Sequence, residues 1–145
     1  MPHLPDPQLL PEFYAWVPLK RFVAWIIDFT LILLLTMMVL VFTVFLTTPI
    51  LPIVYVALNI AYRTVTIARW GATPGMAVMA MELVTLDGRR PDRGLALAHT
   101  LGFTVSMITV VPQIASVAMM LTSPRGQGLS DLLLGTVMLN RAARA

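Results

Sequence analysis

One acidic residue lies inside the longest apolar stretch of the chain. Asp28 is the only charged residue between Phe22 and Leu46. A carboxylate inside a membrane span costs on the order of 2.5–3.5 kcal/mol, so such a residue usually has a partner or a function. It follows Arg21 by seven residues, which at helical rise is about 10 Å deeper on the same helix face. Two interpretations stay open: a proton or cation site, or a buried ion pair that sets helix register.

A second apolar stretch carries polar residues at helical spacing. They fall at i, i+4, i+7, i+8 and i+11: Tyr55, Asn59, Tyr62, Arg63 and Thr66. This spacing places them on one helix face, which in a bilayer should face the bundle interior. Counted from the preceding turn, Arg63 lies about 20 Å deep in a hydrocarbon core of about 30 Å. That depth matches Asp28, so we predict that Arg63 and Asp28 pair, beside a candidate polar path.

Other residue types that support catalysis or metal binding lack the partners they need. The chain has no cysteine, which excludes thiol catalysis and cysteine metal ligands. His99 could relay protons or bind a metal, but the only other histidine is His3, so we expect a hydrogen-bonded histidine at an interface. The ten methionines include pairs inside apolar blocks, where Met is an ordinary filler. We therefore predict no metal site, no cofactor and no enzymatic activity.

The elements that position these residues are predicted to be membrane helices. Hydrophobic residues make up 58% of the 145 residues and charged residues 12%, whereas globular domains typically carry about 25% charged residues. Three apolar blocks are candidates for membrane helices: Phe22–Leu46, Pro52–Ile67 and Leu95–Leu121. The net charge of +3 is spread over short loops, which argues against nucleic acid as a partner. We predict an all-α membrane protein, a small helical bundle in the lipid bilayer.

The stretch between the second and third blocks is predicted to lie outside the hydrocarbon. It opens with GATPG (71–75), which lacks the Lys-Ser/Thr of a nucleotide-binding loop and is not expected to precede a helix. Residues Met79–Leu86 alternate as in a strand, and the turn Asp87–Gly88 follows. A second strand is predicted within Gly135–Arg141. Together they would form a short cytoplasmic two-strand element.

Two paths are open for the third block. Small and polar residues recur at spacings of three and four through Pro112, which favours one kinked helix. A fold-back at Pro112 would instead keep every Lys and Arg on one side and allow the strand after Gly135 to pair with residues 79–86. We favour the fold-back. Lys20, Arg21 and the arginines after the second block predict a cytoplasmic N-terminus by the positive-inside rule.

The chain divides into three parts in this interpretation. Residues 1–19 form a Pro-rich arm, and Phe13, Tyr14 and Trp16 favour the lipid headgroup region, so we expect the arm to lie along the membrane surface. Residues 20–141 form the membrane domain, and residues 142–145 form a tail.

Several motifs occur in a characteristic order: an arginine and an aspartate in the first helix, TPG at 73–75, DG at 87–88 and SPRGQGLSD at 123–131. This order resembles the RDD family of bacterial membrane proteins, whose signature arginine and two aspartates correspond to Arg21, Asp28 and Asp131. The resemblance implies a multi-pass protein of the inner (plasma) membrane and transport of an unidentified ligand. Met76 and His99 stand where the family often has basic residues. Asp131 also has a simpler interpretation, beside Arg125, as the cap of a C-terminal helical turn.

Two functions remain in view. The first is transport of an unidentified ion or small ligand along the face of the second helix and Asp28, which would require a homo-oligomer because few helices enclose little space. The second is an accessory subunit of a larger membrane complex. A water-accessible cavity that reaches Asp28 would favour transport, and a dry, fully paired Asp28 would favour the subunit.

Overall fold

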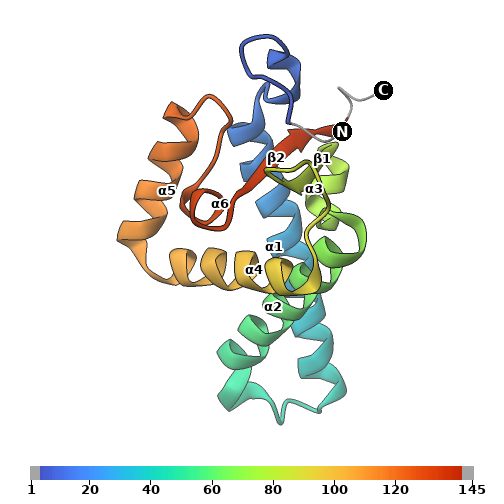
Figure 1. Cartoon of the computed structure of the whole chain (residues 1–145). Coiled ribbons are helices and arrows are strands. Elements are labelled where there is room, and N and C mark those ends of the chain that lie inside the picture. The colour runs from blue at the N-terminus through green and yellow to red at the C-terminus, as the bar shows by residue number, and fades with distance from the viewer. Residues whose placement is uncertain (1–3, 142–145) are drawn as a thin grey trace.

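The computed structural model describes residues 4–141, so the predicted tail and the first residues of the arm lie outside the described residues. Figure 1 shows two long helices, a short sheet near one end of them, and shorter helices alongside. The elements in chain order are η1 (Pro11–Phe13), α1 (Val17–Phe42), η2 (Thr48–Ile50), α2 (Leu51–Trp70), α3 (Pro74–Val78), β1 (Met81–Thr85), α4 (Arg93–Ile108), α5 (Val110–Thr122), α6 (Leu129–Leu134) and β2 (Thr136–Asn140).

Helices α1 and α2 are long and apolar enough to cross a membrane. They have 26 and 20 residues, about 39 and 30 Å at the usual helical rise. The buried residues from Ala24 onward in α1 recur every fourth position, at 24, 28, 32 and 36, so a narrow stripe faces protein and the remaining faces are apolar surface. The chain is therefore an all-α membrane protein with a small sheet. α1 begins and ends earlier than predicted, at Val17 and Phe42.

The prediction that no helix follows GATPG is wrong. Gly71 ends α2 in the left-handed conformation at φ 72°, and Thr73 then caps the five-residue helix α3 by accepting a hydrogen bond from the Met76 amide. Pro74 occupies the first position of α3, where its missing N–H costs nothing. α3 packs against α1 and leads directly into β1.

The third apolar block forms two helices, α4 and α5, which meet at an angle of 114°. The break lies at Thr109, whose backbone is extended, and not at Pro112 as predicted. Pro112 falls in the first turn of α5, where a helix needs no backbone donor. Figure 1 shows α4 lying across α1 and α2, with α5 returning toward the end of α1 that carries the sheet.

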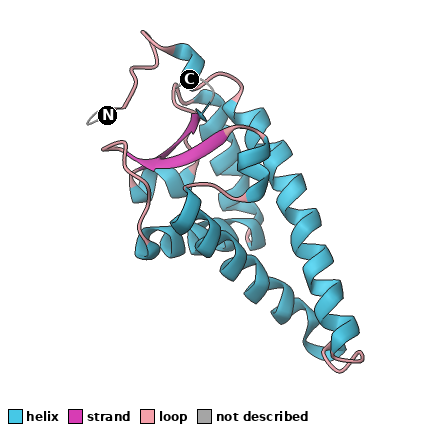
Figure 2. Ribbon diagram, turned by 90° about the vertical axis from the view of Figure 1, so that its right-hand side faces the viewer, coloured by secondary structure: helices cyan, strands magenta, loops and turns pink. Residues whose placement is uncertain are grey.

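The C-terminal strand pairs with the first strand, as predicted for a chain that folds back. β1 and β2 pair antiparallel, with Met81 opposite Asn140 and Thr85 opposite Thr136. Both strands are shorter than the predicted ranges. One face of the sheet carries Met81, Leu83 and Met138, which pack in a core with Val17 and Ala24 of α1, among others. In Figure 2 the two strands lie beside the helices near the chain ends.

The N-terminal arm covers the other face of the sheet. Phe13 and Tyr14 are buried there against Val84, Val137 and Leu139. The Tyr14 hydroxyl donates a hydrogen bond to the carbonyl of Pro5, 2.7 Å away. The expectation that these two rings sit among lipid headgroups is wrong, because they complete a protein core; Trp16 is exposed.

Candidate functional site

The buried carboxylate of Asp28 joins α1 to α2. The Arg63 guanidinium lies 3.6 Å from Asp28 Oδ2, which confirms the predicted ion pair. Tyr62 on the same helix donates its hydroxyl hydrogen bond to Asp28 Oδ1 at 2.9 Å. Neither carboxylate oxygen meets solvent, because Asp28 is 0% exposed. The pair lies inside the hairpin of α1 and α2.

The TPG motif supplies the remaining partners of Asp28. Thr73 donates its hydroxyl to Oδ2 at 2.6 Å, and the Gly75 amide donates to Oδ1 at 2.9 Å. A Cβ added at Gly75 would lie 2.3 Å from the backbone oxygen of Ala24, so only glycine permits this approach. The sequence analysis did not predict this role of the motif, because no local pattern joins residues 73–75 to Asp28, which lies at least 45 positions earlier.

The polar face of α2 points into the bundle, as predicted. Asn59, Arg63 and Thr66 are buried, and Tyr55 and Tyr62 are half-buried. Arg63 donates through Nε to the Asn59 oxygen at 3.0 Å, and Asn59 donates to a threonine hydroxyl of α4 at 3.2 Å. Thr66 bonds the backbone of its own helix. Tyr55 packs edge-on against the ring of Phe29.

A second buried carboxylate, Asp131, brings three distant segments together. Arg21 of α1 lies 2.5 Å from Asp131 Oδ2, and His99 Nε2 of α4 lies 2.9 Å from Oδ1. The hydroxyl of Thr136 donates to Oδ1 at 3.0 Å. The Gly128 amide donates to Oδ2 at 3.0 Å, so Asp131 also caps α6 as predicted.

The contacts of Asp131 with Arg21 and His99 were not predicted. Arg21 reaches Asp131 because the chain returns and brings α6 to the start of α1. His99 makes the expected hydrogen bond and is buried at 3% exposure. Spacing along the chain held no signal for the contact between Arg21, His99 and Asp131, because these residues lie in three separate elements.

The charge of Asp131 is stabilised by its neighbours. Burial opposes the charged form and alone would raise the pKa of Asp131. The charge of Arg21, the hydrogen bond and charge of His99, and the Gly128 amide together outweigh burial. The pKa of Asp131 therefore lies well below its usual value.

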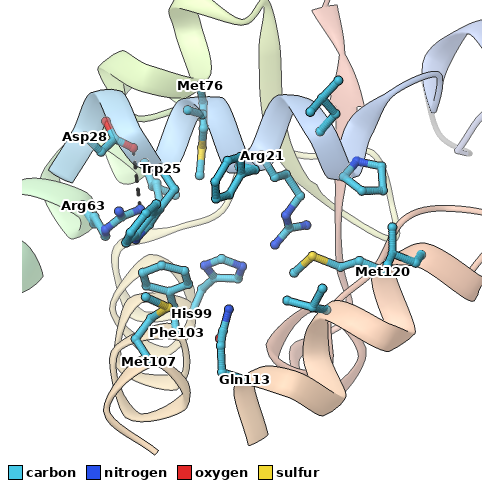
Figure 3. Close-up of a pocket in the computed structure, with 17 residues that line it drawn as sticks. Arg21, Trp25, Asp28, Arg63, Met76, His99, Phe103, Met107, Gln113 and Met120 are labelled. Atoms are coloured by element: carbon cyan, nitrogen blue, oxygen red, sulfur yellow. Dashed lines mark ion pairs between the residues drawn. The ribbon is translucent and has the colours of Figure 1, made fainter. Parts of the chain in front are cut away.

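A cavity of about 520 Å³ lies between α1, α4 and α5, beside both carboxylate clusters. Figure 3 shows Arg21, Arg63, His99 and Gln113 at its edges, with the nitrogen of Gln113 directed inward. The rest of the wall is mainly aromatic and aliphatic. The Arg63 guanidinium also stacks over the ring of Phe103, 4.4 Å from the ring centre.

This arrangement can hold an uncharged or anionic group through hydrogen-bond donors while covering an apolar part with its walls. The size falls within the range of about 300–1,000 Å³ of small-molecule sites. Among residues 4–141 there is no group of three or more His, Asp or Glu side chains placed to hold a metal ion.

The family comparison covers most of the chain. The sequence model of the RDD family matches residues 17–135, from the first residue of α1 to the end of the loop after α6. The match includes Arg21, Asp28, the TPG motif, His99 and Asp131. No curated protein and no solved structure matches the chain.

Proposed function

The chain belongs to the RDD family, and from this premise we propose that it is a non-enzymatic transport protein that binds a small ligand or ion in the cavity between α1, α4 and α5. The observation that carries the proposal is the position of this cavity. It reaches Asp28 and Arg63, the charged pair inside the membrane helices, and also Arg21 and His99 of the second cluster. Ionisable residues inside a membrane usually face a bundle interior or a ligand path.

A location in the inner (plasma) membrane with a cytoplasmic N-terminus is part of the proposal. Arg69, Arg90 and Arg141 line one surface hollow, and Lys20 bonds Asn140 of β2, so basic residues from several elements gather near the sheet. The loop 43–50 at the other end of α1 carries no charge. This asymmetry supports the orientation by the positive-inside rule.

A homo-oligomer is the assembly we propose for transport. The cavity is lined mainly by α1, α4 and α5, with Arg63 and Ile67 of α2 and Met76 of α3. We propose that one chain supplies the binding site and that neighbouring copies supply the rest of the path. α1 exposes large apolar side chains on several faces, including Leu34 and Phe42 at 57% and 80%. Packing of such faces between copies would extend the site across the bilayer.

The test begins with native mass spectrometry of the detergent-purified protein, which identifies any small molecule or ion that stays bound. Uptake of that species, and ion flux, are then measured in sealed vesicles that contain the protein. Val117→Phe, which fills the cavity, should abolish uptake, whereas Val111→Phe on the exposed side of α5 should not. Equal uptake by both variants would reject the cavity as the transport site. Asp28→Asn tests whether ion flux depends on the buried acid.

A second candidate, an accessory subunit of a larger membrane complex, is favoured by one observation. Asp28 is fully buried and has four polar partners, so its charge is already accounted for. Purification in mild detergent followed by mass spectrometry of co-purifying proteins discriminates the two. A single large complex in stoichiometric amount would support the subunit role, and a homo-oligomer alone would support transport.

A further inference from the structure

We infer that the cavity binds an amphiphile with one anionic head group, a carboxylate or a phosphate, and an apolar tail, and that this ligand enters sideways from the bilayer between α1 and α5. The inference rests on the proposed function, because it names the ligand class for the same cavity. Four features carry it: the state of the acidic residues, the unused donors, the walls and the opening.

The two acidic residues beside the cavity have little capacity for a cation. Within the described chain Asp28 and Asp131 each have four polar partners. A carboxylate offers about four acceptor sites, so both are close to saturation. Neither side chain is exposed by more than 1%. A cation in the cavity would have to displace donors that hold the fold together.

The polar groups with unused capacity are hydrogen-bond donors. Among residues 4–141, Arg21 bonds only Asp131, although a guanidinium carries several N–H groups. Arg63 engages its Nε and Nη1 atoms, which leaves Nη2. Gln113 accepts from Ser106 through its oxygen, and its amide nitrogen points into the cavity (Figure 3). Donors in an apolar setting are stabilised by a ligand that supplies carboxylate or phosphate oxygens.

The walls require an apolar part of the ligand. Trp25, Phe103, Met76, Met107 and Val117 form much of the lining around the donors. A small hydrophilic anion would leave these side chains uncovered. An alkyl tail that moves from the bilayer into the cavity covers these side chains and stays in an apolar environment. The combination of clustered donors and a long apolar wall therefore selects an amphiphile.

The opening lies on a lipid-facing side of the helices. Leu19 and Phe22 of α1 and Leu121 of α5 belong to the cavity lining and are 56%, 57% and 71% exposed. An apolar rim of this kind offers no favourable route for a hydrated ion. It does offer one for a molecule that is already dissolved in the bilayer, whose head group can then reach Arg21.

The experiment uses Trp25 as a reporter in the wall of the cavity. The chain has three tryptophans, and the other two, Trp16 and Trp70, are exposed, so Trp16→Phe/Trp70→Phe leaves Trp25 as the only one. This protein is placed in phosphatidylcholine nanodiscs. Quenching of its fluorescence is measured with a brominated long-chain fatty acid, a brominated lysophosphatidic acid, the methyl ester of the fatty acid, and water-soluble 3-bromopropionate.

We expect both anionic amphiphiles to quench saturably and the uncharged ester to bind about tenfold more weakly, the effect of one charge-assisted hydrogen bond. In the same Trp16→Phe/Trp70→Phe background, Gln113→Glu should weaken binding of the two anionic amphiphiles but not binding of the ester. The reason is that the new glutamate carboxylate offers the cavity donors an acceptor from the protein itself. Val117→Phe should weaken binding of both anionic amphiphiles and of the ester, whereas Val111→Phe should weaken binding of none of them.

Equal quenching by the fatty acid and by its methyl ester would overturn the proposal that the ligand carries an anionic head group. Quenching by 3-bromopropionate at the same concentration as the long acid would overturn the tail and entry from the bilayer, and would assign the site to soluble anions. The transport function fails by a different result, namely unchanged uptake in Val117→Phe. The two ideas can therefore be rejected separately.

Discussion

Asp28 and Asp131 are buried carboxyl groups, and each is held by donors from different parts of the chain. Asp28 receives its donors from α2 and from the start of α3, and Asp131 from α1, α4 and β2, among others. The arginines that face them are themselves only 11% and 6% exposed at the side chain. Removing one carboxylate would leave a buried cation unpaired, which typically costs about 3–5 kcal/mol. The two acids therefore fix α1 to the rest of the protein.

Gly75→Ala tests the close approach of α3 to Asp28. The added Cβ would lie 2.3 Å from the Ala24 carbonyl oxygen, which is backbone and cannot move aside cheaply. We expect a loss of about 1–3 kcal/mol in the free energy of unfolding, visible as a lower melting temperature in detergent. Gly94→Ala is the matched control, because a Cβ there meets only Asp92 at 3.5 Å. Equal melting temperatures for the two variants would contradict the steric argument.

Stability at acid pH tests the Asp131 cluster. The pKa of Asp131 is lower in the folded protein than the value of about 3.9 expected for an unfolded chain. Its contribution to the free energy of unfolding is therefore complete well above pH 4 and is lost as pH falls below that value. Melting temperature measured against pH should fall less in Asp131→Asn than in the native protein.

Asp87→Asn serves as the control for this measurement, because Asp87 lies in the exposed turn after β1. The melting temperature of Asp87→Asn should fall with decreasing pH as steeply as that of the native protein. The assignment to Asp131 would be contradicted by an equally steep fall in Asp131→Asn.

At the scale of elements, α3 depends on one hydroxyl group. Thr73 caps α3 by accepting from the Met76 amide and ties it to α1 by donating to Asp28. Thr73→Val keeps the shape and removes both bonds, so we expect a loss of about 2–4 kcal/mol in unfolding free energy. Thr73→Ser keeps the hydroxyl and should lose about 1 kcal/mol or less. Thermal unfolding in detergent compares the two, and similar losses would show that methyl packing, not the hydroxyl, holds α3.

The sequence predicts these elements unevenly, for physical reasons. α1 and α2 follow from long apolar runs, and the strands follow from alternation, so their existence is predictable even though α1 starts earlier at Val17. α3 is not, because a five-residue helix that contains Pro74 and Gly75 is too short to show a helical period in the sequence. The break of the third block falls at Thr109 and not at Pro112. Proline is tolerated in the first turn of a helix, so a new helix can begin at Val110 and include Pro112.

The same contrast applies to the candidate site. The pair Asp28–Arg63 is predictable, since depth in two neighbouring apolar helices places both residues at one level. The contact of Arg21 with Asp131 and His99 depends on the path of α4, α5 and α6, which no local pattern specifies. The resemblance to the RDD family singled out Arg21 and Asp131 without saying that they meet.

At the scale of the whole molecule, the path of the chain across the membrane can be tested by labelling, because the chain has no cysteine of its own. Single replacements Leu46→Cys, Asp87→Cys and Pro124→Cys lie at exposed positions in three connecting segments. We expect a membrane-impermeant thiol reagent applied to intact cells to label Leu46→Cys alone. Asp87→Cys and Pro124→Cys should react only after the membrane is opened.

Labelling of Pro124→Cys but not of Asp87→Cys in intact cells would mean that the bent pair α4–α5 crosses the membrane, against the fold-back. Labelling of Asp87→Cys together with no labelling of Leu46→Cys would reverse the proposed orientation. The two results therefore test path and orientation independently.

The distance along the chain between Arg21 and Asp131 has a consequence for how the protein is made. The two residues are 110 positions apart, and ribosomes add about 5–20 residues per second, so Arg21 leaves the ribosome several seconds before its counter-charge exists. The Asp28–Arg63 pair is complete much earlier. The hairpin of α1 and α2 can thus be inserted with its own charges matched, while Arg21 stays near the membrane surface until the last helix and strand arrive. The contact between Arg21 and Asp131 therefore forms only after α6 has been made, later than the contact between α1 and α2.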